Sequence, residues 1–418
     1  MNRPLVALVV LLSPVVCAQE APLTIERAVE LAVQRNERAA IAETTVDAAE
    51  ARVRRARTAF FPRVDVSGNL RNDYDDGTER TLSTAATLTQ PIFDARAFPL
   101  YRMQRFERDA TRLTADESKR LLAFDAAAVF LGTLSAEQVL SAAEHRRDFA
   151  QTNLDDVRAR FEAGLVSSND VTRAELELAT AVRGVAQALG DLQEAHVELE
   201  TLLKTDVDGP LATPVEIIEG ATEGRELDAA SVASAQERRS DVGAQRARVE
   251  AARAFADEPS ARFIPSVGLT AQTRNINDGP ISERTNDGFV GLNFAWPVFD
   301  AGLRGADRAE RTANLRAAEL TLDFELREVE RELRSAAVQL TTEQAASREA
   351  MAALRAARKN ADETNALYRE GLASALELAD ATQRLFEAEV AEVTARYRMA
   401  LSYLALREAS GLMPIPAE

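Results

Sequence analysis

Cysteine and histidine are nearly absent from this chain of 418 residues, which has one cysteine, Cys17, and two histidines, His145 and His196. A single cysteine cannot form an intrachain disulfide, so the fold must be held together by packing. Neither histidine has neighbours at the spacing of a zinc or catalytic site, and we interpret each as a surface or packing residue. A glycine-rich phosphate loop is missing as well. The sequence therefore predicts no enzyme, no cofactor and no metal site.

Positive charge is also in short supply. The 50 Lys and Arg residues are outnumbered by 67 Asp and Glu residues, which gives a formal net charge of −17. Because phosphate binding needs a basic face, nucleic acid is not an expected partner. Beyond the N-terminal segment we find no stretch that approaches the ~18 apolar residues of a transmembrane helix. Any part of the protein that enters a membrane should therefore do so as strands.

The N-terminal segment is typical of an exported protein. It has a short basic start at Arg3, an apolar run from Leu5 to Val16, and a small residue, Ala18, before Gln19. The run is too short to span a membrane, so residues 1–18 are interpreted as a secretory signal peptide. A lipoprotein signal that ends at Cys17 is the alternative.

The chain repeats itself at about half its length. Two breaks in otherwise helical stretches, "RFEAGLVSSNDV" (160–171) and "YREGLASALELA" (368–379), share matching residues that stand 207 positions apart: Phe161 and Tyr368, Gly164 and Gly371, Leu165 and Leu372, Ser167 and Ser374, and Asp170 and Glu377. Such a period predicts two copies of one structural unit. The expected division is a first repeat (19–203), a linker rich in Pro and Gly (204–231), a second repeat (232–410) and a C-terminal tail (411–418).

Each repeat contains a predicted β-hairpin, at 62–92 and 265–298. Apolar and polar residues alternate with period two in four segments, 63–72, 82–91, 265–273 and 288–299, with Asp-Gly turn signals at 76–77 and 278–279. Strands of about nine to ten residues with one apolar and one polar face are typical of a membrane barrel. Four strands cannot close a barrel, and open edges are not tolerated in lipid, so other copies must supply the rest. Three chains would give twelve strands. Edge hairpins of a soluble domain are the alternative.

The remainder is predicted to be helical. Two long rods, 94–161 and 300–368, have apolar residues at three- and four-residue spacing, and each would be about 90 to 100 Å long. Shorter return helices are expected at 171–203 and 376–409, and helices before the strands at 25–60 and 232–256. The fold class is thus mainly α with a small β part, built from long antiparallel helical hairpins. A coiled-coil bundle is the alternative.

The two breaks have a local structural explanation. Glycine is favoured as the left-handed residue that ends a helix, so Gly164 and Gly371 should stop the two rods. Ser167 with Asp170, and Ser374 with Glu377, each form a Ser-x-x-acid pattern. This spacing predicts a capping box at the start of each return helix, which by itself explains both acids.

Taken together, these features resemble the outer-membrane efflux protein family, the TolC-like trimeric channel-tunnels. The resemblance rests on "RSDVGAQRARVEAARA" before the third strand, on "QPIFDA" and "WPVFDA" after the second and fourth strands, and on the order of the two breaks. It implies a homotrimer with a 12-stranded barrel in outer-membrane lipid and a 12-helix α-barrel in the periplasm. The breaks would then be hairpin tips at which a periplasmic adaptor protein docks, with an inner-membrane pump as the further partner.

The resemblance also implies roles for individual residues. The positions that match the adaptor-docking tips are Gly164, Leu165, Val166 and Ser167, then Gly371, Leu372, Ala373 and Ser374. Glu377 and Asp380, one helical turn apart, match acidic rings at the pore aperture; an ordinary solvated face is the alternative. Asp170 and Tyr368 match a latch between neighbouring hairpins. The arginine that completes that latch elsewhere is replaced here by Ala373, which puts a tightly closed resting state in doubt.

The function expected from this resemblance is a passive exit duct for small molecules from periplasm to exterior, as the outer-membrane component of a tripartite efflux system. Within the same class, type I protein secretion is the alternative, because the same duct serves both. A non-conducting helical scaffold that spans the periplasm is the alternative from another class. The sequence does not identify the substrate, the adaptor or the pump.

Overall fold

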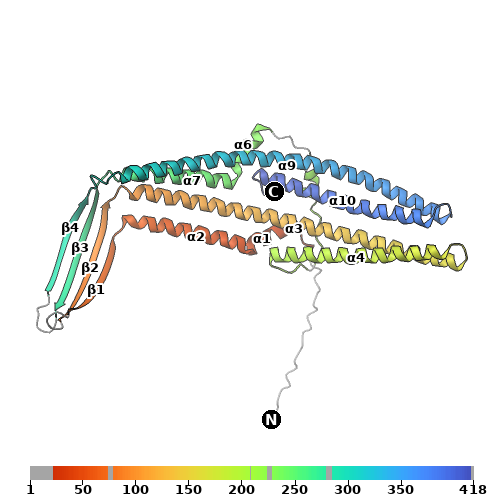
Figure 1. Ribbon diagram of the computed structural model, residues 1–418, viewed down its shortest axis with the longest axis horizontal. Helices are drawn as coiled ribbons and strands as arrows, with labels where there is room; N and C mark the ends of the chain where they lie inside the picture. The colour runs from red at the N-terminus through yellow and green to blue at the C-terminus, as the bar shows by residue number, and fades with distance from the viewer. Residues whose placement is uncertain (1–21, 74–78, 208, 224–227, 279–284, 416–418) are drawn as a thin grey trace, which may run out of the picture.

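The computed structural model describes residues 22–73, 79–207, 209–223, 228–278 and 285–415. They form one elongated body with a small sheet at one end and two helical turns at the other (Figure 1). The long helices α3 (Ala97–Glu162) and α9 (Leu303–Arg369) run the length of the helical part and return as α4 (Ser168–Leu203) and α10 (Ala375–Ala409). At ~1.5 Å per residue, α3 and α9 are each about 100 Å long. The proposed signal peptide with Cys17, and both hairpin turn signals, lie wholly or partly outside the described residues.

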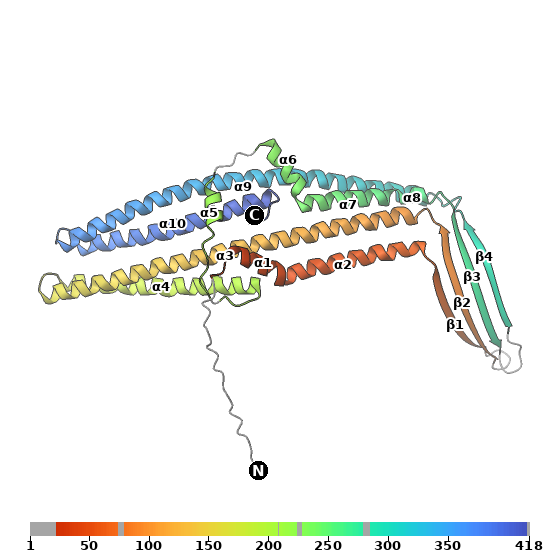
Figure 2. The ribbon, with the colours of Figure 1, turned by 180° about the vertical axis from the view of Figure 1, so that it is seen from behind.

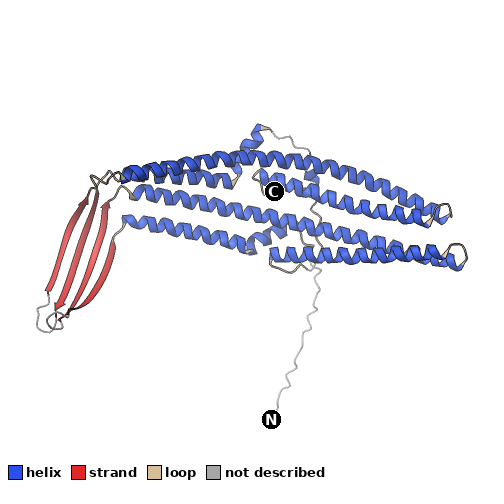
Figure 3. Cartoon of the chain, viewed as in Figure 1, coloured by secondary structure: helices blue, strands red, loops and turns tan. Residues whose placement is uncertain are grey.

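The four strands form one antiparallel sheet at the end of the helices (Figure 3). They are β1 (Arg63–Asp73), β2 (Glu79–Phe93), β3 (Ser266–Asp278) and β4 (Thr285–Ala295), in the order β1-β2-β3-β4. The two predicted hairpins are confirmed, and β2 pairs with β3, so the two repeats share one sheet. Within the described structure, β1 and β4 each keep one edge unpaired.

The strand predicted at 288–299 is too long at its C-terminal end. Strand β4 stops at Ala295, so Trp296, Val298 and Phe299 lie beyond it. Pro297 explains the end, because proline has no N–H to donate to a neighbouring strand. The strands have 11 to 15 residues, somewhat longer than the nine to ten expected.

One face of the sheet is apolar and open to its surroundings. Val66, Val290 and Leu292 have exposed fractions of 78%, 75% and 71%. The register aligns Val64 with Leu88, which faces Ala271 on β3, so this apolar face continues across the strands. No helix covers these strands in either of the two views (Figures 1 and 2). Exposed apolar surface of this extent in a sheet requires a partner or a lipid environment.

The single helix expected at 25–60 is instead broken. Its parts are α1 (Ile25–Arg35), α2 (Glu37–Arg57) and a short 3-10 helix, Thr58–Phe60. Asn36 is extended between α1 and α2, where its side chain accepts a hydrogen bond from the Arg38 N–H. Its Nδ2 also donates to the carbonyl of Leu202, 3.0 Å away at the end of α4. The break therefore allows Asn36 to form a hydrogen bond with a distant part of the chain.

The helix expected at 232–256 and the linker at 204–231 also differ from expectation. The helix is divided at Arg239 into α6 (Ala229–Arg238) and α7 (Ser240–Ala256), followed by the short α8 (Glu258–Ala261). The extended backbone at Arg239 allows its guanidinium to pair with Asp241 and Glu332. The linker contains a helix of its own, α5 (Val215–Thr222), which buries Ile217 and Ala221. Packing against α10 explains why this Pro-flanked segment folds.

The main core lies midway along the helices, where α1, α3, α5 and α10 meet. Phe130, Leu131 and Leu134 of α3 are completely or almost completely buried there. Helix α3 also contains an 18-residue window apolar enough to cross a membrane, so the expectation that no such stretch exists was wrong. Part of this window, 44%, is buried inside the protein. We interpret its apolar character as a consequence of core packing.

Candidate functional site

The two helical turns at the far end of the molecule are built by the same hydrogen bonds. After α3, Gly164 has φ +74°, its N–H donates to the carbonyl of Phe161, and the Leu165 N–H donates to the carbonyl of Arg160, both at 2.9 Å. This pair of bonds is a Schellman motif, which only a left-handed residue can close. It confirms that Gly164 ends the rod.

The second turn repeats this geometry. Gly371 has φ +79°, its N–H donates to Tyr368 at 3.1 Å, and the Leu372 N–H donates to Leu367 at 2.8 Å. Both turns display their leucine: Leu165 is 74% exposed and Leu372 is 72% exposed. An apolar side chain held in solvent by a rigid turn is a candidate contact for another protein. Val166 and Ala373 are half-buried behind the leucines, against a small core cluster.

Both predicted capping boxes are confirmed. Ser167 Oγ accepts from the Asp170 N–H at 3.3 Å, and an Asp170 carboxylate oxygen accepts from the Ser167 N–H at 3.0 Å. At the start of α10, Ser374 Oγ and the Glu377 carboxylate exchange the same bonds at 3.2 and 2.7 Å. The backbone N–H of Ser374, followed by its hydroxyl, lowers the pKa of Glu377 below its ordinary value.

The two acids assigned to the pore aperture are exposed, and each has a local partner. Glu377 caps α10, as described above, while Asp380 pairs with Arg384 at 2.9 Å one turn further on. Sequence reasoning missed Arg384, although an acid and an arginine four residues apart on a helix are a recognisable ion-pair pattern.

Tyr368 lies at the contact between the two hairpins and is only 6% exposed. Arg160 of the other repeat places its guanidinium 5.1 Å from the centre of the Tyr368 ring and donates to the Tyr368 carbonyl at 3.3 Å. The tyrosine hydroxyl is buried without a hydrogen-bond partner among the described residues. Burial raises the pKa of Tyr368, Arg160 lowers it, and the carboxylates of Asp156 and Asp170 raise it further.

The contact of Arg160 with Tyr368 was missed by sequence reasoning. The sequence repeat contained an indication of this contact, because Arg160 is matched 207 residues later by an uncharged residue, Leu367. Asp170 points its carboxylate at Ser167 in this chain. The described structure therefore brings Tyr368 together with Arg160 through direct contacts, and with Asp170 only through a longer-range electrostatic interaction.

Among the described residues, no group of three or more His, Cys, Asp or Glu side chains is placed to hold a metal ion. His196 Nδ1 lies 3.1 Å from the carbonyl of Leu192, one turn earlier on the same helix. The two turns expose leucines, small residues and acids, which together are a candidate contact surface for another protein.

Comparisons with known proteins agree with this architecture. A family model described as "Outer membrane efflux protein" matches residues 28–204 and 232–412, which correspond to the two repeats. The outer membrane protein TolC of Escherichia coli is 23% identical over 386 residues, covering 88% of this chain and 78% of TolC. The toluene efflux pump outer membrane protein TtgC of Pseudomonas putida is 25% identical over 421 residues, covering 93% of this chain and 82% of TtgC.

Solved structures share the fold. The outer membrane channel MtrE of Neisseria gonorrhoeae, solved in its open state, gives a TM-score of 0.79 at 18% identity and covers 93% of this chain and 89% of MtrE. The outer membrane protein VceC of Vibrio cholerae gives 0.76 at 17% identity, with 93% of this chain and 96% of VceC covered. TtgC is named as an efflux pump protein and MtrE as a channel, while TolC and VceC are named as outer membrane proteins; none of the four names describes an enzyme. With its two matched repeats, its four strands and its paired helical hairpins, the chain belongs to the outer membrane efflux protein family, as a TolC-like outer-membrane protein whose helical part lies in the periplasm.

Proposed function

We propose that three copies of this chain form a passive exit duct of a tripartite efflux system. The observation that carries the proposal is the four-stranded sheet, which has an open apolar face and two unpaired edges, β1 and β4, within the described structure. In lipid, unpaired backbone groups cost several kcal/mol each, so β1 of one copy must pair with β4 of the next. Three copies close a 12-stranded barrel, and their helices continue it as an α-barrel through the periplasm.

The tips of the helical hairpins are the proposed docking site for a periplasmic adaptor protein, which connects the duct to an inner-membrane pump. Leu165 and Leu372 support this role, because each is largely exposed to solvent on a rigid turn. The two similar turns give six docking notches in a trimer. The residues assigned to them are Gly164, Leu165, Val166, Ser167, Gly371, Leu372, Ala373 and Ser374.

At the mouth of the duct, Glu377 and Asp380 are proposed to form rings of carboxylate in the trimer. Both are exposed on α10 close to the tip, so three copies would concentrate cations at the aperture. Tyr368 and Asp170 are proposed to latch neighbouring hairpins. The buried hydroxyl of Tyr368, which has no hydrogen-bond partner among the described residues, supports this role, since such a group gains a hydrogen bond when a second chain supplies an acceptor.

Planar-bilayer recording of the purified protein tests the duct. We expect a trimer by chemical crosslinking and discrete conductance steps. A protein that inserts without conducting would refute the duct and favour a scaffold.

A matched pair of variants tests the docking site. Leu165→Asp with Leu372→Asp should abolish efflux by cells that lack their own outer-membrane duct, because it places charge on the exposed contact residues. Val338→Asp is the control, since Val338 is 68% exposed but lies in the middle of α9, far from the tips. Surface labelling of the barrel confirms insertion of both variants. Normal efflux by the tip variant would show that docking lies elsewhere.

A further inference from the structure

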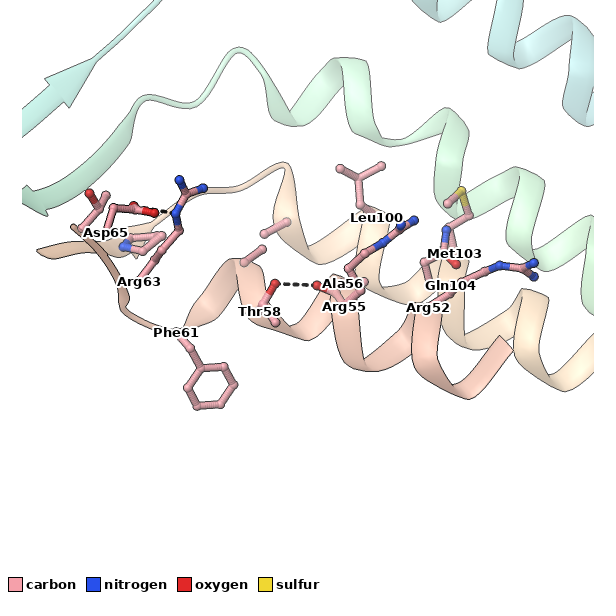
Figure 4. Close-up of a pocket in the computed structure, with 14 residues that line it drawn as sticks. Arg52, Arg55, Ala56, Thr58, Phe61, Arg63, Asp65, Leu100, Met103 and Gln104 are labelled. Carbon is pink, nitrogen blue, oxygen red and sulfur yellow. Dashed lines mark hydrogen bonds and ion pairs between the residues drawn. The ribbon is translucent and has the colours of Figure 1, made fainter. Parts of the chain in front are cut away.

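A groove at the opposite end of the helices, where helix passes into strand, collects arginine side chains. Its walls come from the end of α2, the beginnings of β1 and α3, and the end of β2, and it encloses about 690 Å³ (Figure 4). Three arginines line it, Arg52, Arg55 and Arg63, against one acid, Asp65. In a chain with a formal net charge of −17, an excess of positive charge in one groove is unusual.

Two of these arginines lack a counter-charge. Arg63 is paired with Asp65 at 2.6 Å. Arg52 and Arg55 stand three residues apart on one face of α2, and neither side chain has an ion pair or hydrogen bond within the described part of the chain. Both are exposed. They therefore present unneutralised guanidinium groups to the groove.

The position of Arg52 and Arg55 near the C-terminal end of α2 does not explain why these two side chains lack a partner. Cations are favoured at the C-terminal end of a helix, which explains why this turn is basic. However, Arg54 has Glu50 at 3.9 Å, and Arg57 lies over the Phe61 ring at 5.4 Å. Of the four arginines at positions 52 to 57 of α2, only the two that line the groove remain without such a neighbour within the described structure.

The groove has room for a ligand beside these arginines. Small side chains, Ala56, Ala59 and Ala97, form part of its lining. A planar guanidinium donates two parallel hydrogen bonds to a phosphate, sulfate or carboxylate group, and two guanidinium groups can hold such an anion from two sides. The groove therefore fits a small multivalent anion better than an apolar ligand.

The strand alternation indicates which side of the barrel wall the groove lies on. Arg63 and Asp65 alternate with Val64 and Val66, so the groove opens on the face opposite the apolar one. This step rests on the proposed barrel: if Val64 and Val66 contact lipid, the arginines face the lumen.

We propose that Arg52 and Arg55, with Arg63 at the rim, form an anion-binding station inside the duct, at the junction of strands and helices. Its ligand is the phosphate, sulfate or carboxylate group of a soluble solute that passes through the lumen. Together with the acids at the other end of the helices, it gives the duct two zones of opposite charge. Anionic groups are retained at the outer zone and cations at the inner one.

Calorimetric titration with inorganic pyrophosphate tests the site on the full chain, purified in detergent as the assembled protein. We expect binding that weakens about tenfold or more for each arginine removed, because a hydrogen bond to a charged group contributes about 1.5–3 kcal/mol. Arg52→Gln with Arg55→Gln should therefore lose binding. Arg54→Gln with Arg57→Gln is the matched control, since it removes the same charge from the same end of α2 and should keep the wild-type affinity within about twofold to threefold.

Current recordings then locate the site. Pyrophosphate added on the extracellular side should reduce the single-channel current of the wild type and of the control, and not of Arg52→Gln with Arg55→Gln. A wild type that does not conduct refutes the duct, while the titration still decides whether the arginines bind an anion.

Three results would overturn the proposal. Equal loss of affinity in both double variants would mean that general charge is responsible. A loss of trimer stability in Arg52→Gln with Arg55→Gln, without pyrophosphate binding by the wild type, would mean that a neighbouring chain neutralises these arginines. A phospholipid that remains bound in native mass spectrometry of the wild type and is lost only from that variant would assign the groove to a lipid headgroup. Retention of the trimer by size-exclusion chromatography shows that each variant is folded.

Discussion

The same substitution, glycine to alanine, should have opposite effects at two positions of one helical hairpin. Gly164 is left-handed with φ +74°, whereas Gly190 lies within α4 and has no positive φ. A Cβ at either position would meet no atom within 4 Å, so steric clashes contribute nothing. The two variants therefore isolate backbone conformation from packing.

The expected magnitudes follow from the backbone. At Gly164, alanine in the left-handed region costs about 1–2 kcal/mol, partly offset by the lower entropy of the unfolded chain, which leaves a net cost of about 1 kcal/mol. At Gly190, alanine improves helix propensity by about 1 kcal/mol. If exchange occurs by local opening, about 1 kcal/mol corresponds to about a fivefold change in rate. Gly164→Asn should cost less than Gly164→Ala, because asparagine tolerates the left-handed region.

Hydrogen exchange measured by mass spectrometry on the purified protein provides the assay. The informative amide at the tip is that of Leu165, which donates to the Arg160 carbonyl across the Schellman motif. We expect about fivefold faster exchange there in Gly164→Ala and slower exchange around residue 190 in Gly190→Ala. Changes of the same sign at both positions would refute the argument from backbone conformation.

Three further predictions concern the caps and one buried charge. Ser374→Ala should loosen the first turn of α10 by about 1 kcal/mol, measured as faster amide exchange in that turn and nowhere else. The pKa of Glu377 is lowered in the folded protein, so its contribution to the cap is fully present above the ordinary pKa of 4.5 and is lost as the pH falls through the folded pKa. Amide exchange in the first turn of α10, corrected for its intrinsic pH dependence, should show this loss in the wild type. Glu377→Gln should not show it. Glu258 is 4% exposed and paired with two arginines, so Glu258→Ala should lower the free energy of unfolding by about 3–5 kcal/mol. Glu30→Ala breaks an exposed pair with Arg27 and should leave the midpoint of thermal unfolding nearly unchanged. Equal midpoints for the two variants would contradict this prediction.

Local features of this protein could be predicted from the sequence because their physics is local. The Schellman turns depend on one residue, Gly164 or Gly371, that adopts a positive φ without penalty. The capping boxes depend on side chains that bond to backbone three residues away. The strands were recognisable because period-two alternation places apolar residues on one face, and the repeat at 207 residues indicated that the unit occurs twice.

Contacts between distant segments could not be predicted in the same way. The break at Asn36 depends on a carbonyl of Leu202, 166 residues away, and a continuous helix would satisfy local propensity equally well. The contact between Arg160 and Tyr368 exists because the two repeats pack against each other. The sequence around Arg160 alone predicts an ordinary surface residue. Pairing of β2 with β3 likewise joins the repeats through backbone bonds that any sequence of suitable pattern can form.

The arginine groove shows the same division most clearly. The sequence determines that Arg52 and Arg55 share a helix face, because three-residue spacing fixes their direction relative to each other. It does not determine what they face. That depends on the angle at which α2 meets α3 and on the strand register that places Arg63 opposite Thr89. Since charge acts through space and not along the chain, only the tertiary structure decides which arginines are neutralised and which are left to bind a ligand.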